Sequence, residues 1–389
     1  MLIYRYFYLN SKKDIFGNIT ANPSLNEDGG NNYAENIALN GFYDLEYLQR
    51  RIITEKIMYD IFVSKGGKPK CKHPFYMTLG CCDEWFFEKK HCFGSVALDL
   101  ENISEDCISF TYGDSIPTFK DEHNDGKEYR KNVYTLKEIN NLIEKYGYPN
   151  KWNTFEKHGL ENYIEVQIWD DEVFKDFDLK YNPNAIRKIT DAIILANKNI
   201  DNIFIEEKGL NYYLSLIKNS SLYIWYKNLI INNQTIFIQG KVHGYEHALK
   251  CSLYAFILSY LNSFDCKRTK ELIYASYYHD LGRNSSEKYK SHAEISSKLV
   301  ENYIKEKDVD IDIIKNAIRL HNLNISGNDI IIDLLKDIDS LDYLRLGLGT
   351  FDLAYIKDYN VKKMVRVALE LNLYMFYDFD SFKRILLED

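Results

Sequence analysis

The adjacent residues His279 and Asp280 constrain the fold of this chain more than any other feature of its sequence. They follow the segment from Glu271 to Tyr278, which has the apolar content of a buried helix. A carboxylate at the end of such a helix is costly unless it is paired or bound to a metal ion. The pair therefore predicts a helical domain with a polar site in its interior.

Other histidines and carboxylates of the C-terminal half stand at comparable positions. His247 opens an amphipathic helical segment, His321 ends another, and Asp339 lies on the apolar face of a third. A single histidine on an apolar face is usually only a core residue, but several such groups on separate helices are hard to explain as independent core residues. Imidazoles and carboxylates are ligands that Mn, Fe and Zn accept, so we predict one shared metal site.

The order of these residues along the chain resembles the motif order of the HD-domain superfamily of metal-dependent phosphohydrolases. The resemblance covers about residues 223 to 346. The motifs that carry the resemblance are His243-Gly244-x-x-His247, His279-Asp280-Leu281-Gly282-Arg283 and Asp337-x-Asp339-x-Leu341-Asp342. The resemblance implies that His247, His279, Asp280 and Asp339 bind a divalent metal. The chain departs from the family after the first ligand, where Lys250-Cys251 replaces the frequent Arg-Val and keeps a positive charge.

The number of metal ions stays open at this stage. Members of the superfamily with two ions add two histidines before the last aspartate, and His292 and His321 occupy such positions, with Asp280 then bridging the ions. Alternatively, His292 only begins a helix after Ser291, and His321 either supports a metal ligand without touching the metal or contacts the phosphate. The cofactor expected is one or two ions of Mn, Fe, Zn, Co or Mg.

The resemblance implies hydrolysis of a nucleotide or another small phosphate ester, because a bound metal lowers the pKa of water and polarises phosphoryl oxygens. Asp280, Arg283 and His243 are the expected catalytic residues, with Asp342 as a second candidate for proton transfer. Arg283, Lys250 and Lys288 are expected to bind the substrate phosphate, since cationic side chains pair with phosphate.

Two other functions fit the same sequence. One is a di-iron oxygenase, because enzymes of that type share the HD fold and the additional histidines. The other is a two-part sensor or effector, for example in defence or stress, in which the N-terminal domain binds or modifies a partner.

We predict that residues 1–183 form a separate α+β domain and that residues 184–389 form a helical HD-type domain. Alternating or β-rich segments predict strands, two further segments predict helices, and Tyr181-Asn182-Pro183-Asn184 is expected to end the first domain. The strands are expected at 2–8, 75–79, 95–98, 107–112 and 163–169, and the helices at 44–63 and 135–146. Residues 186–232 are expected to form a helical connection.

Two groups of residues in the N-terminal domain could carry chemistry. The first is a set of thiols and imidazoles that suits zinc but lacks the usual spacing, so ordinary reduced thiols are favoured: Cys71, His73, Cys81, Cys82, His91 and Cys92. The second faintly resembles the layout of ADP-ribosyltransferases, with Arg5 on a first strand, Ser109-Phe110-Thr111 on another and Glu165 on a late strand. Either way, a binding or regulatory domain is expected.

Composition excludes few functions. The net charge of −8 gives no indication of general nucleic-acid binding, and no apolar run approaches the roughly 20 residues of a membrane span. The first residues lack the pattern of a signal peptide, and the seven cysteines form no spaced disulfide framework. We therefore expect a cytoplasmic protein with reduced thiols and a small phosphorylated substrate.

Overall fold

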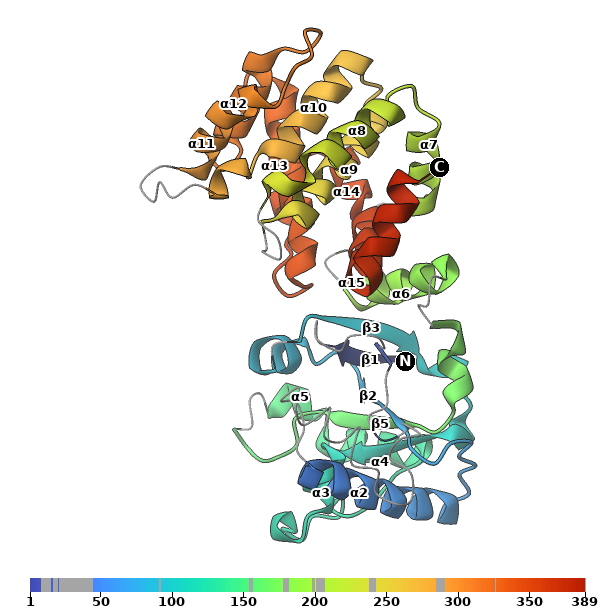
Figure 1. Ribbon diagram of the computed structural model, residues 1–389. Coiled ribbons are helices and arrows are strands. Elements are labelled where there is room, and N and C mark those ends of the chain that lie inside the picture. Colours follow the sequence, from blue (N-terminus) through green and yellow to red (C-terminus); the bar gives the residue numbers. More distant parts are fainter. Residues whose placement is uncertain are drawn as a thin grey trace. The chain divides into compact units, whose positions relative to one another are not determined.

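The protein was studied as a computed structural model, which divides into two compact units, Met1–Asn197 and Lys198–Asp389 (Figure 1). The structure describes residues 1–7, 15–16, 20, 45–90, 92–153, 157–177, 182–197, 200, 207–237, 243–284, 291–325 and 327–388.

The first unit is built on a five-stranded antiparallel sheet with the strand order β3-β1-β2-β5-β4. Its strands are β1 (Leu2–Phe7), β2 (Phe75–Leu79), β3 (Gly94–Asp99), β4 (Ile108–Tyr112) and β5 (Ile164–Ile168). The sequences of β4 and β5 alternate between apolar and polar residues, and every residue of both strands is buried, so their polar side chains lie inside the unit. The prediction of an α+β N-terminal domain is confirmed.

Helices pack against this sheet through apolar residues. Met58 and Phe62 of α2 join Trp169 and Val133 in one core cluster, and a capping box at Thr135 starts α4. The helices of the unit are α2 (Leu45–Ser64), α3 (Ser115–Phe119), α4 (Leu136–Tyr146), α5 (Pro149–Trp152) and α6 (Pro183–Ala196), with a π-helical turn at Glu84–Lys89 and a 3-10 turn at Asp171–Phe177.

The second unit contains helices joined by turns and no strand among its described residues, which confirms the expected change from a sheet to helices (Figure 1). Its helices are α7 (Leu210–Lys218), α8 (Tyr223–Asn233), α9 (Tyr245–Leu261), α10 (Cys266–Tyr278), α11 (His292–Leu299), α12 (Ile311–Leu320), α13 (Ile330–Leu341), α14 (Tyr359–Lys363) and α15 (Val365–Leu387). Among the described residues, none of the helices combines the length and the apolar character needed to cross a membrane.

The central helix of this unit is α9, which packs against α7, α10, α13 and α14. The sequence predicts an amphipathic helix there, but from Tyr245 to Ser259 every residue except Glu246 is buried. The reason is that neighbouring helices cover α9 on all sides, so even polar side chains such as Lys250 and Ser252 lie in the interior. Polar side chains near the start of α9, such as His247 and Lys250, are therefore buried and need hydrogen-bond or ion-pair partners within the protein.

The boundary between the units lies after Asn197, rather than at the expected position between residues 183 and 184. The difference is due to α6, which packs on β3 and places Ala196 in a cluster with Tyr4, Tyr6 and Ala97. The expected helical connection is also interrupted, because α6, α7 and α8 are separate helices. Apolar periodicity predicted the helix α6 but did not show that α6 packs against the sheet of the first unit.

Candidate metal centre

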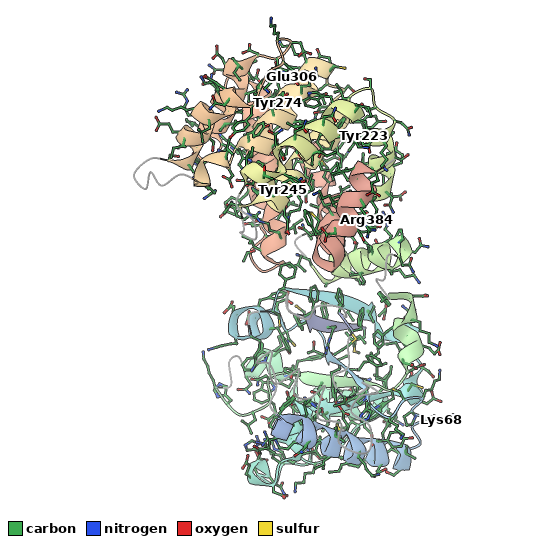
Figure 2. All side chains as sticks on the ribbon, in the orientation of Figure 1. Lys68, Tyr223, Tyr245, Tyr274, Glu306 and Arg384 are labelled. Carbon is green, nitrogen blue, oxygen red and sulfur yellow. The ribbon has the colours of Figure 1, made fainter. Side chains whose placement is uncertain are left out.

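Histidines and aspartates from separate helices meet at the N-terminal end of α9. His247 lies in its first turn, two residues after Tyr245, which Figure 2 labels. His279 and Asp280 come directly after α10, and Asp339 lies in the last turn of α13. Helix ends suit such a site, because their backbone groups lack intrahelical partners and can fix polar side chains.

Two aspartates each approach the facing imidazoles of His247 and His279, whose nitrogen atoms recur in the groups of side chains that could hold a metal ion. The Nε2 atoms of His247 and His279 are 3.1 Å apart. Oδ1 of Asp339 lies 3.4 Å from Nε2 of His247 and 3.7 Å from Nε2 of His279. Oδ2 of Asp280 lies 3.7 and 3.8 Å from the same two nitrogens. These separations resemble those between neighbouring ligands of one metal ion, since metal–ligand bonds of about 2.0–2.2 Å place adjacent donor atoms roughly 3 Å or more apart.

The other oxygen of Asp280 is part of a second group. Its Oδ1 atom lies 3.3 Å from Nε2 of His292 and 4.0 Å from Nε2 of His321. The two Nε2 atoms are themselves 3.3 Å apart. Asp280 thus stands between two sets of imidazole nitrogens, which is the arrangement that a carboxylate bridging two cations requires.

The Nδ1 atoms of two histidines are held by the backbone. Nδ1 of His279 donates to the carbonyl of Ser276 at 2.9 Å, and Nδ1 of His321 donates to that of Ile318 at 2.7 Å. Each imidazole therefore carries its proton on Nδ1 when neutral, which leaves the Nε2 lone pair free. Such hydrogen bonds fix both the orientation and the tautomer of metal-binding histidines.

His247 finds its Nδ1 partner in a side chain instead. Nδ1 lies 2.6 Å from Oδ2 of Asp342, which is completely buried. Lys250 and Arg345 flank this carboxylate, with Nζ 2.9 Å from Oδ1 and Nη1 2.9 Å from Oδ2. Burial raises the pKa of Asp342, but these cations and His247 outweigh it and lower the pKa to about 2.

The close approach of imidazoles and carboxylates shifts the pKa values of His279, Asp280 and Asp339. Burial lowers the pKa of His279, but Asp280 and Asp339 more than compensate and raise it to about 9. The pKa values of Asp280 and Asp339 are in turn held well below the usual range, against the effect of burial, by the imidazoles around them. The carboxylates therefore stay ionised, as metal ligands must.

The imidazoles of the second group favour the neutral form. Burial and the nearby His279 lower the pKa of His321 to about 4. Burial and Arg283 also lower the pKa of His292. Neutral imidazoles with free Nε2 lone pairs are the form that binds metal.

A cation fits the site on these grounds. Two Nε2 acceptors that face each other at 3.1 Å repel unless a proton or a metal ion lies between them, and the proton that His279 retains up to high pH supplies this charge. Oδ1 of Asp280 is also buried without an aligned hydrogen-bond donor, although Nε of Arg283 lies 2.8 Å away. The donor set of imidazoles and carboxylates suits borderline divalent ions.

Two of the predicted catalytic residues lie at the rim of the site. The side chain of His243 is 32% exposed, and its Nδ1 atom lies 2.7 Å from Oδ2 of Asp280. The side chain of Arg283 is 34% exposed and belongs to the 3-10 turn Leu281–Asn284. Both can be reached from outside while they touch Asp280.

Other predicted roles need correction. Lys250 does not present its charge to a substrate, because its ammonium group is buried between Asp342 and the side-chain oxygen of Asn372, at 2.9 and 2.8 Å. Asp342 cannot transfer a proton to a leaving group, because it is inaccessible. Lys288 lies outside the described residues. Arg345, which sequence reasoning missed, is the second cation beside Asp342.

Cys251 comes close to the ligands without being well placed as one. Its Sγ atom lies 3.6 Å from Nδ1 and 3.8 Å from Nε2 of His247. A ligand that shared a metal with this imidazole would lie near the Nε2 lone pair and distinctly farther from Nδ1. The almost equal distances place the thiol against the ring, and its pKa is raised by burial and nearby carboxylates. Cys251 therefore packs against His247.

The cysteines and histidines of the first unit form no zinc cluster among its described residues. Cys82 and Cys92 belong to one apolar core cluster, whereas Cys71 packs against another. His73 binds the buried carboxylate of Glu55, with its Nδ1 atom 2.6 Å from Oε2. His91 lies outside the described residues. Reduced thiols in apolar surroundings account for this group.

The residues of the suggested ADP-ribosyltransferase layout do not share one face of the sheet. Tyr4 pairs with Thr78, which pairs with Glu165, so these three point to one face. Arg5 follows Tyr4 and therefore points to the other face. Thr111 pairs directly with Glu165, and Gln167 joins their side chains through hydrogen bonds of 3.1 and 3.0 Å.

The arginine beside Glu165 is Arg51, which the sequence did not single out. Its Nη1 atom lies 4.0 Å from Oε2 of Glu165 and donates to Ser115 at 2.8 Å. Burial and the nearby Asp114 carboxylate raise the pKa of Glu165 to about 7, although Arg51 opposes them. The first unit therefore holds a buried carboxyl group whose charge changes near neutral pH.

Comparison of the chain with protein-family models, with curated proteins and with solved structures finds no match.

Proposed function

We propose that the second unit is a metal-dependent phosphohydrolase of the HD type, which hydrolyses a nucleotide or another small phosphate ester. The observation that carries this proposal is the convergence of His247, His279, Asp280 and Asp339 from three parts of the helical unit. Their order along the chain is the one that the motifs of this superfamily require.

The residues around Asp280 fit two ions better than one. His247, His279, Asp280 and Asp339 would hold the first ion, and Asp280, His292 and His321 the second. Mn, Fe, Zn, Co and Mg are the candidate metals, and the imidazole-rich donor set favours the first four. A bound ion of this kind lowers the pKa of a water molecule and polarises a phosphoryl oxygen.

The residues of the rim would bind the substrate. Arg283 now pairs with Asp280, and once a cation compensates that carboxylate, its guanidinium group can hold two phosphate oxygens. His243 keeps its Nδ1 proton on Asp280 and is partly exposed, so when the ring is protonated on both nitrogens, its Nε2–H group can donate the second proton to the leaving oxygen and leave a neutral imidazole. The buried imidazoles keep their Nδ1 protons on fixed acceptors throughout.

Metal analysis combined with a phosphate-release screen tests the proposal. The purified full-length chain, loaded with each candidate ion, is incubated with nucleoside mono-, di- and triphosphates, cyclic nucleotides and simple phosphate esters. We expect metal-dependent release from at least one class, and its loss in Asp280→Ala. A chain that binds none of these ions at micromolar concentration would contradict the proposal.

The same six ligands would also serve a di-iron oxygenase. The metal separates the two functions, because an oxygenase needs redox-active iron and consumes O2, whereas a phosphohydrolase works with Mn or Zn. Oxygen uptake by the iron-loaded chain, without phosphate release, would favour the oxygenase.

A second activity in the first unit would make the protein a two-part sensor or effector. The observation in its favour is the buried Glu165, with a pKa of about 7, beside Arg51 and Ser115. Perturbed carboxyl groups of this kind are frequent in active sites. A transfer of ADP-ribose from NAD to a partner that survives Asp280→Ala, but not Glu165→Gln, would support it; transfer unaffected by Glu165→Gln would exclude this site.

A further inference from the structure

The Nδ1 atom of His247 has a different kind of hydrogen-bond acceptor from the Nδ1 atoms of His279 and His321. His279 and His321 stand at the C-terminal ends of their helices, where carbonyls lack intrahelical partners, and each donates to the carbonyl three residues earlier. His247 stands in the first turn of α9, where the unpaired backbone groups are donors. The carbonyl three residues before it, at Gly244, already accepts the amide of Ala248 at 3.1 Å. The acceptor that His247 uses comes from another element.

Asp342, directly after α13, provides this acceptor through a chain of contacts that extends to the C-terminal helix. Its Oδ2 atom accepts the proton of His247 at 2.6 Å. Its Oδ1 atom lies 2.9 Å from the ammonium group of Lys250, which also donates to Asn372 of α15 at 2.8 Å. Arg345 donates to Oδ2 at 2.9 Å. Two hydrogen bonds to Oδ2 and the ion pair between Lys250 and Oδ1 thus surround one fully buried carboxylate.

We propose that Asp342 and Lys250 are positioning residues of the metal centre, which fix the tautomer of His247 so that its Nε2 lone pair faces the metal. Asp342 accepts the Nδ1 proton, and Lys250, which also binds Asn372, holds the carboxylate in place. Neither residue touches substrate. The inference rests on the proposed function, because it assigns these residues a role toward the metal.

The tautomer of His247 can be read directly in the metal-free chain. Long-range 15N–1H spectra of the histidine side chains at alkaline pH distinguish a proton on Nδ1 from one on Nε2. We expect the Nδ1–H form of His247 in the unmodified chain. In Asp342→Asn an amide faces three donors and cannot accept from all of them, so we expect a mixture of tautomers.

Metal affinity provides the second measurement. Calorimetric titration with Mn2+ should show an affinity reduced about 10- to 100-fold in Asp342→Asn, as for other partners that orient metal-binding histidines. Lys250→Met keeps the contact between Asp342 and His247, so we expect a smaller decrease and little change in the tautomer.

Glu271→Gln is the matched control. Glu271 is a buried carboxylate of α10 that accepts from Arg268 and from the amide of Asp310, at 2.9 and 2.8 Å. Its replacement should lower stability without changing the tautomer of His247 or the affinity for Mn2+.

Two results would overturn the inference: an unchanged tautomer and affinity in Asp342→Asn, or an equal loss of affinity in Glu271→Gln. A chain that binds no Mn2+ would instead contradict the proposed function. The histidine spectra of the metal-free chain would still decide whether Asp342 sets the tautomer.

Discussion

Oδ1 of Asp280 lies 3.3 Å from Nε2 of His292, whereas it is Oδ2 that approaches Nε2 of His247, at 3.7 Å. One carboxylate therefore faces two sets of imidazole lone pairs, one with each oxygen. Within the described structure Oδ1 has an ion-pair contact with Nε of Arg283 at 2.8 Å but no aligned hydrogen bond, and it also faces the Nε2 atoms of His292 and His321. This relationship is the basis for predicting two ions rather than one.

The first prediction concerns metal stoichiometry. After loading with Mn2+ and removal of free metal, elemental analysis should find two ions per chain, and one ion in His292→Ala or His321→Ala, because each change removes a ligand of the second group only. His158→Ala, an exposed site in the first unit, should retain two. A single ion in both the unmodified chain and His292→Ala would show that His292 is not a ligand.

The second prediction concerns catalysis. Asp280→Ala should reduce metal-dependent phosphate release about 1,000-fold or more, because the loss of a bridging ligand removes several kcal/mol of transition-state stabilisation. Circular dichroism should show unchanged helix content, since Asp280 follows α10 rather than lying within it. Full activity of Asp280→Ala on the best substrate would mean that catalysis takes place elsewhere.

The third prediction separates substrate binding from chemistry. Arg283→Gln should raise KM for the phosphorylated substrate about 10- to 100-fold, because a hydrogen-bonded charge pair contributes roughly 1.5–3 kcal/mol. Arg283→Lys keeps the charge but not the two parallel hydrogen bonds, so its KM should lie between the two. Steady-state kinetics with metal at saturation would test this order; equal KM values in all three chains would exclude Arg283 from phosphate binding.

The sequence predicted those parts of the molecule that depend on local pattern. Strands, long helices and the change from sheet to helices follow from periodicity, and the residues that meet around Asp280 follow from motifs whose spacing reflects helix ends. The same reasoning missed partners that come from distant segments. The burial of Lys250 depends on Asn372, 122 residues later in the chain, and no local pattern reports that contact.

Strand register explains the other failure. Whether Arg5 or Arg51 lies beside Glu165 depends on the face of the sheet on which each side chain lies. The register places Tyr4, rather than Arg5, on the face of Glu165, and α2 brings Arg51 to that face from another element. A shift of one residue would reverse the assignment, and the sequence alone does not fix the register.

The fourth prediction follows from the pKa of Glu165, which is raised from an ordinary value near 4.5 to about 7 by burial and Asp114. A raised pKa means that the folded chain holds a proton that the unfolded chain loses, so the stabilisation is complete below about pH 4.5 and is lost as pH rises through 7. The loss should amount to about 3 kcal/mol in the free energy of unfolding, from 1.36 kcal/mol per pKa unit.

Urea unfolding of the full chain between pH 4.5 and 8 would measure this loss, with tryptophan fluorescence as the probe, because Trp85, Trp152 and Trp169 all lie in the first unit. Glu165→Gln resembles the protonated acid, so it should match the unmodified chain near pH 5 and be the more stable of the two above pH 7. Glu46→Gln, on the exposed side of α2, should follow the unmodified chain at every pH. If the stability of Glu165→Gln instead falls with pH as steeply as that of the unmodified chain, Glu165 is ionised over the whole range. Glu165 and Arg51 would then form an ordinary buried ion pair, and the pKa of Glu165 would not lie near neutral pH.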